Sequence, residues 1–521
     1  MTAIEVGRAL RRREISAREL VGSALRRTRE LNPTLNAFAL IDEEGARAAA
    51  RLADEQFAAG VDLGPLHGIP VAVKDLVDMA GLPTSCGSGS SFGALATADA
   101  EVVRRLRDAG AVIIGKTTLH EFAYGATGDR SVHGASRNPV DPSRMSGGSS
   151  GGSAVAVAAG MVPIAVGTDT AGSVRVPAAL CGVVGFKPAY DAVPSAGVYP
   201  LAPSLDHVGV FAATSEDALV AYQAIGDRPV TSLLPDVTNG HASRLAGDAE
   251  RVAGGAQGVA GDAKRLAGGA VPVAGGGGQA AGGAGRVGSG AGRVGGAQRA
   301  GALDVRGGAG RVAVGWIPPG AIAATDPRIE KLTRRRLDGA GFAVDVVSGF
   351  PKWERSLFEE FSVLQGREAF RVHEHHLAAD QDLIDPEVLA RLRKGGEVTD
   401  RRYARAGEAR HEIAIMVDEL LTTYDVLALP TVPIVAPAVG ARSISVAGAQ
   451  LEVRQALLSL TCLWNLTGSP AISVPVGRVD GLPVAVQLVS APGNEQLLFA
   501  AARELEIVDN RTKESHAVDP G

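Results

Sequence analysis

Short apolar runs alternate with charged, amphipathic segments over most of this chain. Helical spacing of apolar residues covers about 15–32, 42–59, 100–109 and 326–421. Apolar runs with the length and composition of buried strands lie at 69–74, 111–115, 311–316, 426–433, 470–475 and 482–488. Ser16 is expected to cap the first helix, because its side chain can accept a bond from an unpaired N–H of the first turn. Strands and helices that alternate in this way predict a layered α/β fold.

The segment from about 244 to 299 departs from this pattern and repeats every seven residues, as in RLAGDAE and RVAGGAQ. A heptad period is typical of a coiled coil, but each copy offers one Leu or Val beside Ala and carries glycine. Each glycine inside a helix costs about 1 kcal/mol relative to alanine, and so thin an apolar stripe does not recover that loss. We therefore predict a low-complexity insertion, disordered or weakly helical, that interrupts one domain spanning 1–521. An oligomerisation arm is the alternative.

Composition excludes several classes of function. The chain has 521 residues, of which 45% are hydrophobic and 21% charged, so it can bury a sizeable core. Its net charge of −5 gives no reason to expect nucleic acid or an anionic membrane as a partner. No apolar run is long enough for a membrane span, and residues 1–13 do not resemble a secretory signal. The three cysteines lie far apart and are odd in number, which indicates buried thiols and a cytoplasmic location.

Three motifs match patterns whose structural context is absent. Gly110–Thr117 fits the phosphate-loop pattern, but its four middle residues form the strand itself, so their N–H groups pair in a sheet. Ser149 lies in a GxSxG pattern, yet a loop with two prolines precedes it where a nucleophile elbow requires a strand. His373 and His376 share a helix face without a third ligand, so we expect that face to be solvated. No nucleotide, metal or other cofactor is expected.

Three other segments carry groups suited to nucleophilic catalysis. Lys74 ends an apolar strand, and burial lowers the pKa of an amine, which suits a general base. Residues 146–153 form a Gly/Ser-rich loop that leads directly into a small-residue helix. Residues 167–178 follow a strand and turn at Gly172, just before Ser173. Successive N–H groups in such a turn can form an oxyanion hole, and the serine at its end is well placed as a nucleophile.

These segments resemble the amidase signature family. GGSSGGSA at 147–154 and GTDTAGSVRVPA at 167–178 match its Gly/Ser-rich block. The separations between Lys74 and Ser149 and between Ser149 and Ser173 are those typical of the family. Further blocks that match lie at 115–117, 121–122, 181–188, 429–431 and 481–487. The resemblance covers about 5–240 and 310–505, and it excludes the heptad segment.

The resemblance implies a single α/β/α domain around a large mixed central sheet and a Ser-cisSer-Lys triad. Ser173 matches the acyl-forming nucleophile, Ser149 the bridging serine that follows a cis peptide bond, and Lys74 the base. The N–H groups that match the oxyanion hole belong to Thr170, Ala171, Gly172 and Ser173. Ala171 stands where a second glycine is common, which affects the expected choice of substrate more than the expected activity.

The function so implied is hydrolysis of a carboxylic amide to an acid and ammonia or an amine through a serine acyl-enzyme. The alternatives are the amidase subunit of a tRNA-dependent amidotransferase, an allophanate- or biuret-type hydrolase of urea derivatives, and a catalytically silent scaffold. The blocks at 204–207 and 460–468 look more like those of stand-alone amidases. The expected partner is a small-molecule amide, and a homodimer is left open. Residues 124–129 and segments after 311 are expected to line the pocket, but they do not name the amide.

Overall fold

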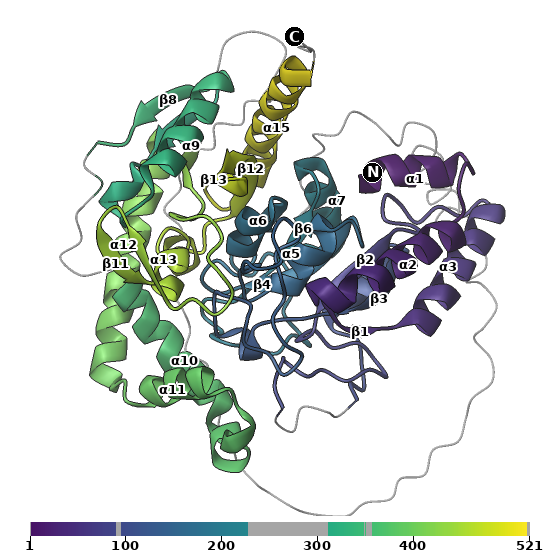
Figure 1. Cartoon of the computed structure of the whole chain (residues 1–521), viewed down its shortest axis with the longest axis horizontal. Coiled ribbons are helices and arrows are strands. Elements are labelled where there is room, and N and C mark those ends of the chain that lie inside the picture. The colour runs from purple at the N-terminus through teal and green to yellow at the C-terminus, as the bar shows by residue number, and fades with distance from the viewer. Residues whose placement is uncertain (1, 90–94, 228–310, 349, 351–356, 518–521) are drawn as a thin grey trace, which may run out of the picture. The chain divides into compact units, whose positions relative to one another are not determined.

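Strands from both ends of the chain join one mixed sheet in the computed structural model (Figure 1), which describes residues 2–89, 95–227, 311–348, 350 and 357–517. The strand order is β1-β3-β2-β4-β6-β5-β12-β13-β9-β7-β8. These strands are β1 Phe38–Ile41, β2 Pro70–Lys74, β3 Val112–Thr117, β4 Ile164–Asp169, β5 Val184–Lys187, β6 His207–Ala212, β7 Ala313–Trp316, β8 Ala343–Val346, β9 Val426–Pro430, β12 Ala471–Val479 and β13 Leu482–Val489. A separate hairpin pairs β10 Ser443–Val446 with β11 Ala449–Glu452.

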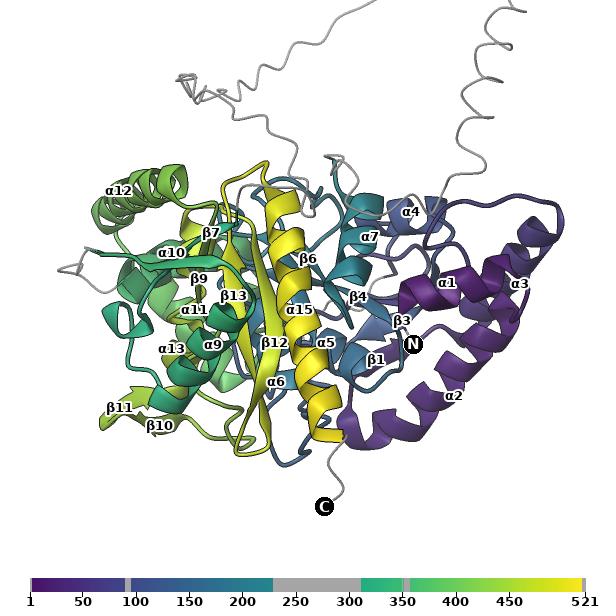
Figure 2. The same cartoon turned by 90° about the horizontal axis from the view of Figure 1, so that it is seen from above.

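Helices cover this sheet in an α/β/α arrangement. They are α1 Ala3–Arg11, α2 Ala17–Leu35, α3 Glu43–Ala58, α4 Glu101–Asp108, α5 Gly151–Ala158, α6 Arg175–Cys181, α7 Ser215–Ile225, α9 Pro327–Gly339, α10 Leu357–Ala379, α11 Pro386–Gly396, α12 Asp400–Thr423, α13 Val453–Leu458, α14 Leu463–Leu466 and α15 Glu495–Ala517. Short 3-10 turns lie at η1 Glu121–Ala123, η2 Pro319–Ala321 and η3 Gln381–Leu383. Helix α15 runs along β12 and also packs on α7 and α9 (Figure 2). Helices α5 and α6 pack on each other and on the sheet.

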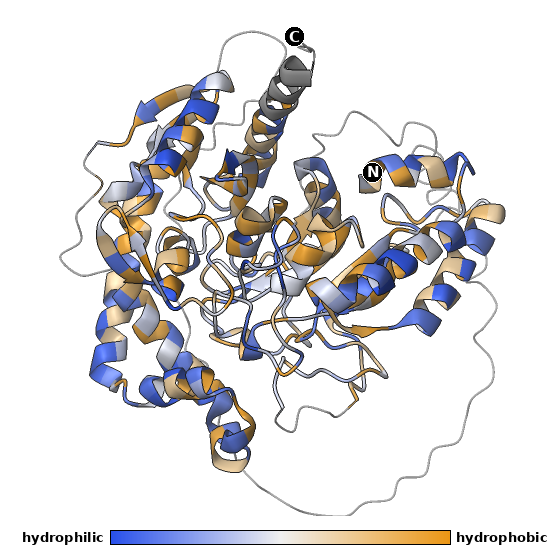
Figure 3. Ribbon diagram, in the orientation of Figure 1, coloured by the Kyte–Doolittle hydropathy of each residue, from blue (hydrophilic) through white to orange (hydrophobic). Residues whose placement is uncertain are grey.

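Burial follows the pattern of side chains. Helix α5 consists of small and apolar residues and is buried almost all round, whereas α2 and α3 each keep an exposed charged face (Figure 3). A large apolar cluster joins α6, α10 and α12 to β9 and to the segment 456–466. The three cysteines are buried and free, as the composition indicated. No helix in the described ranges is long and apolar enough to cross a membrane.

The predicted α/β fold and most of the predicted elements are confirmed, but α1, β1, β5 and β6 were not predicted, and two predicted regions differ. Helix α2 has the expected Ser16 capping box, but it continues through Pro33 to Leu35. The region 326–421 is not helical throughout, because strand β8 pairs in parallel with β7. Its four residues, AVDV, are too few to show an alternating pattern and only Val344 is even partly buried, so its pairing depends on the neighbouring strand rather than on local pattern. The predicted insertion at 244–299 lies outside the described residues.

Candidate active site

Two neighbouring parallel strands end at the same edge of the sheet. Strand β2 ends at Lys74 and β4 ends at Asp169, and Val73 of β2 pairs with Val166 of β4. Parallel strands in register bring their carboxyl ends together, which is where α/β folds place ligands. Helix α5 begins at Gly151, inside the Gly/Ser-rich segment 146–153, so only residues 146–150 of that segment form the loop. The topology thus gathers the three segments singled out in the sequence.

Lys74 and Ser149 form a buried polar contact at this edge. Lys74 Nζ lies 2.7 Å from Ser149 Oγ and 2.8 Å from Thr168 Oγ1, and it donates to both oxygens. Lys74 and Ser149 are fully buried, and the Gly148–Ser149 peptide bond is cis, as the resemblance implied. Burial lowers the pKa of Lys74 to about 7, although the carboxylates of Asp206 and Asp169 act in the opposite direction. A large fraction of Lys74 is therefore neutral near pH 7.

Asp75 follows Lys74 but belongs to another contact. It forms a buried ion pair with Lys116 of β3, with 2.7 Å between Oδ1 and Nζ. Neighbouring residues at the end of a strand point in opposite directions, so the carboxylate of Asp75 does not stabilise the charged form of Lys74. Asp75, the acidic residue next to Lys74 in the sequence, therefore does not offset the effect of burial on the pKa of Lys74.

The turn that follows β4 presents a row of backbone N–H groups. In the part of the chain that the structure describes, the N–H groups of residues 170–173 donate no hydrogen bond to the protein. The next two N–H groups, of Val174 and Arg175, donate to the Asp169 carboxylate at 3.1 and 3.4 Å. The Ser150 N–H donates to the Ser173 carbonyl at 3.3 Å, which ties this turn to the Gly/Ser-rich loop. Among the described contacts, no hydrogen bond joins the hydroxyls of Ser149 and Ser173.

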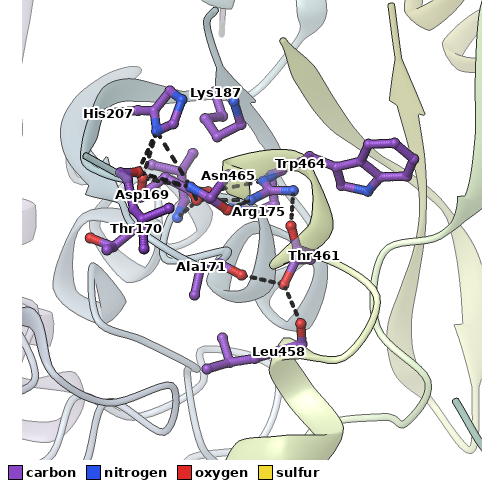
Figure 4. Close-up of polar contacts among 12 residues, drawn as sticks. Asp169, Thr170, Ala171, Arg175, Lys187, His207, Leu458, Thr461, Trp464 and Asn465 are labelled. Carbon is purple, nitrogen blue, oxygen red and sulfur yellow. Dashed lines mark hydrogen bonds and ion pairs between the residues drawn. The ribbon is translucent and has the colours of Figure 1, made fainter. Parts of the chain in front are cut away.

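A buried network of ion pairs and hydrogen bonds packs against the turn after β4 (Figure 4). Arg175 and Asp169 are both fully buried and form an ion pair of 2.8 Å. Burial would raise the pKa of Asp169, but the charge and hydrogen bonds of Arg175 outweigh it and lower that pKa, so the carboxyl is ionised. Arg175 also donates to Asn465 Oδ1 and Gln487 Oε1, each at 2.6 Å, and to the Thr461 carbonyl at 2.9 Å. Sequence reasoning missed this network, although Asp169 and Arg175 flank Ser173 within one motif and offered a signal.

The face of α10 that carries His373 and His376 is buried, so the sequence prediction for this face was wrong. His373 is fully buried and His376 is nearly so, where a solvated face was expected. The His373 ring packs on Phe122 and Tyr199, with ring centroids 4.3 and 5.5 Å apart. Burial lowers the pKa of His373 to about 3, so it is neutral. Phe122 of η1 and Tyr199, both distant in the sequence, cover this face. In the described part of the chain no cluster of side chains is arranged to hold a metal.

A cavity of about 90 Å³ lies beside the Lys74 contact. Thr168 and Thr170 line it at the end of β4, Ala123 lines it from η1, and all of its other lining residues lie within 190–208. The segments expected to line a pocket, 124–129 and those after 311, do not line this cavity. The sequence analysis noted only the block 204–207 in this range and did not assign it to the pocket, because these residues reach the site only through the tertiary fold.

Comparisons with known proteins find similarity over most of the chain. The amidase family model matches residues 19–242 and 344–499. A glutamyl-tRNA(Gln) amidotransferase subunit of Acidothermus cellulolyticus is 47% identical over 45% of this chain, a match that spans only 48% of that relative. The corresponding subunit from Anaeromyxobacter sp. (strain K) is 36% identical over 96% of this chain and 95% of its own length. AtzE, the 1-carboxybiuret hydrolase subunit of Pseudomonas sp. (strain ADP), is 33% identical over 97% of this chain and 98% of its own length. A crystal structure of an amidase superposes with a TM-score of 0.77 at 30% identity, covering 97% of this chain and 99% of that one.

Proposed function

The chain belongs to the amidase signature family, and we propose that it hydrolyses a carboxylic amide through Ser173, Ser149 and Lys74. One observation carries this proposal: the fully buried Lys74 Nζ lies 2.7 Å from Ser149 Oγ, and burial brings the lysine pKa to about 7. A base with that pKa accepts protons at the pH at which most enzymes work. The N–H groups of residues 170–173, free of protein partners in the described structure, support an oxyanion hole beside it.

The proposed reaction begins with two proton transfers. Neutral Lys74 accepts a proton from Ser149 while Ser149 accepts one from Ser173, and Ser173 Oγ bonds to the amide carbonyl carbon. The carbonyl oxygen becomes an oxyanion that the N–H groups of residues 170–173 stabilise, where each donor contributes on the order of 3 kcal/mol. The transfer between the two serines requires a hydrogen bond between their hydroxyls, and catalytic groups often form such bonds only once substrate is bound.

The second half of the proposed reaction releases both products. The relay returns a proton to the amide nitrogen as the carbon–nitrogen bond breaks, which frees ammonia or an amine and leaves an acyl group on Ser173. Water then gives a proton to the same relay and attacks the acyl carbon. Cleavage of the ester bond restores Ser173 and releases the acid. The atoms and charges of this sequence balance with water as the only co-reactant.

The test uses the purified full-length chain without added partners. Ammonia or amine release is measured over aliphatic, aryl and urea-like amides, and nucleophile labelling is measured with a fluorophosphonate. We expect turnover of at least one class and loss of both turnover and labelling in Ser173→Ala. Ser143→Ala, at an exposed serine of the preceding loop, is the matched control and should retain both. Full activity in Ser173→Ala would show that another residue is the nucleophile.

Two other reactions share this chemistry. The glutamyl-tRNA(Gln) amidotransferase relatives make the amidase component of a tRNA-dependent amidotransferase the second candidate, which would act only with other subunits present. The AtzE relative supports a urea-derivative hydrolase. Turnover of simple amides by the chain alone favours the stand-alone amidase. Turnover restricted to urea-like amides favours the urea-derivative hydrolase, and activity only with added subunits favours the amidotransferase component.

A further inference from the structure

We propose that Thr461 is a positioning residue that aims the N–H of Gly172 at the reacting carbonyl oxygen. This inference rests on the proposed function, and it assigns a role in that reaction to a segment some 290 residues from the turn. Thr461 touches no reacting atom in this proposal. Its hydroxyl acts through the peptide bond between Ala171 and Gly172.

Thr461 holds this peptide by its carbonyl. The side chain is fully buried, and its Oγ1 donates to the Ala171 carbonyl at 2.6 Å (Figure 4). The Leu458 carbonyl is also within reach, at 3.2 Å. A hydroxyl has one hydrogen, so it serves one acceptor at a time, and the shorter distance favours Ala171.

The geometry of a trans peptide transmits this contact to Gly172. Carbonyl and N–H point in opposite directions across a trans peptide bond, and only Gly148–Ser149 is cis among the described residues. The Gly172 N–H therefore points away from Thr461. It has no hydrogen-bond acceptor of its own in the described structure, so no acceptor on that side fixes its direction. The contact on the carbonyl side is what sets it.

Gly172 and Thr461 also fit each other sterically. The φ of Gly172 is 136°, a region that favours glycine. A Cβ atom added at Gly172 would overlap Thr461 Oγ1 and Cβ. The threonine therefore lies directly against the backbone of the turn, which lets a single hydroxyl determine the orientation of that peptide.

Thr461 is itself held rigidly in place. Its N–H donates to the Leu458 carbonyl at 3.1 Å, and its own carbonyl accepts from Arg175 at 2.9 Å. Arg175 is paired with Asp169, the residue at which β4 ends and the turn begins. Asp169 and Arg175, at the two ends of the turn, and Thr461 are thus joined by one buried network of hydrogen bonds. A group on a rigid frame can orient a donor before substrate arrives, which is the condition for electrostatic preorganisation.

The test compares Thr461→Val with Thr461→Ser. Removing a whole oxyanion donor costs roughly 10²–10³ in kcat, which bounds the effect of misdirecting one. We expect Thr461→Val to lower kcat on the order of tenfold or more, with KM changed by less than about twofold, because the contact acts only in the transition state. A trifluoromethyl ketone analogue of the best amide, which forms a tetrahedral oxyanion, should bind more weakly by the same factor. Thr461→Ser keeps the hydroxyl and should restore most of both.

Thr333→Val is the matched control for loss of a buried hydroxyl. Thr333 is fully buried in α9 and donates to the Ile329 carbonyl at 2.9 Å, far from the turn in the sequence and without contact to it. We expect it to change the melting temperature but not kcat. Wild-type kcat and ketone affinity in Thr461→Val would overturn the inference, even if the variant melts earlier. Should that variant fail to fold, Thr461→Ala carries the same comparison. Absence of turnover in the wild type would instead overturn the proposed function.

Discussion

The depressed pKa of Lys74 leads to a quantitative prediction about the rate. A free lysine titrates near pH 10.4, so at pH 7 roughly one molecule in 2500 is neutral. Burial brings the pKa of Lys74 to about 7, which makes about half of the molecules neutral at that pH. The fold thus raises the population of the competent base by roughly a thousandfold.

This shift determines the shape of the pH profile. If neutral Lys74 is the base, kcat/KM should rise about tenfold per pH unit below about pH 6 and level off above about pH 8. At pH 5 it should be about a hundredfold below the plateau, because only that fraction of Lys74 is then neutral. The assay is initial-rate release of amine from the best substrate between pH 5 and 9, with stability at each pH checked separately. A flat profile over this range would contradict the assignment of Lys74 as the base.

Substitution of Lys74 tests its role as the base independently of the pH profile. Arginine keeps its proton at any usable pH, so Lys74→Arg should be as inactive as Lys74→Ala, with a loss on the order of a hundredfold or more. Lys331→Arg, at an exposed lysine, is the matched control and should match the wild type. Near-normal activity in Lys74→Arg would show that the residue acts as a fixed positive charge. Arginine is also larger than lysine and could inactivate the enzyme by its size alone. The pH profile of the wild type does not depend on that effect, so it tests the base assignment separately.

Three further outcomes follow from the same structure. Asp169→Asn leaves Arg175 buried without its counter-charge, so urea denaturation should show a loss of roughly 3–5 kcal/mol in the free energy of unfolding. Because the folded pKa of Lys74 lies below its unfolded value, the unfolded chain binds more protons between about pH 7 and 10; the stability of the wild type relative to Lys74→Met should therefore rise with pH across that window in chemical denaturation. Replacing 244–299 with a short Gly/Ser linker should leave kcat/KM and the melting temperature nearly unchanged, whereas loss of both or a change in oligomeric state by light scattering would favour an oligomerisation arm.

Local pattern along the chain was enough to predict the parts of the site that depend on near neighbours. Apolar pattern predicted the strand that ends at Lys74 and a strand before residue 167, which the structure extends to Asp169 as β4. The Gly/Ser-rich loop before α5 was recognisable from its composition. The turn at Gly172 could also be read directly, because a positive φ is a property that glycine confers on its own position. These features depend on neighbours within a few residues, which is the range over which side-chain pattern dictates backbone conformation.

The surroundings of those parts came from long-range packing. Packing placed Thr461 and Asn465 against the turn after β4, brought Gln487 to Arg175, and buried His373 under aromatic rings that the helical pattern of α10 did not reveal. The partners in these contacts lie hundreds of residues apart, so no local period encodes them. A buried charge or carbonyl without a hydrogen-bond partner costs free energy, so the packed fold pairs each one with a group that lies nearby in space. Which group lies nearby depends on the tertiary packing and not on the spacing along the sequence.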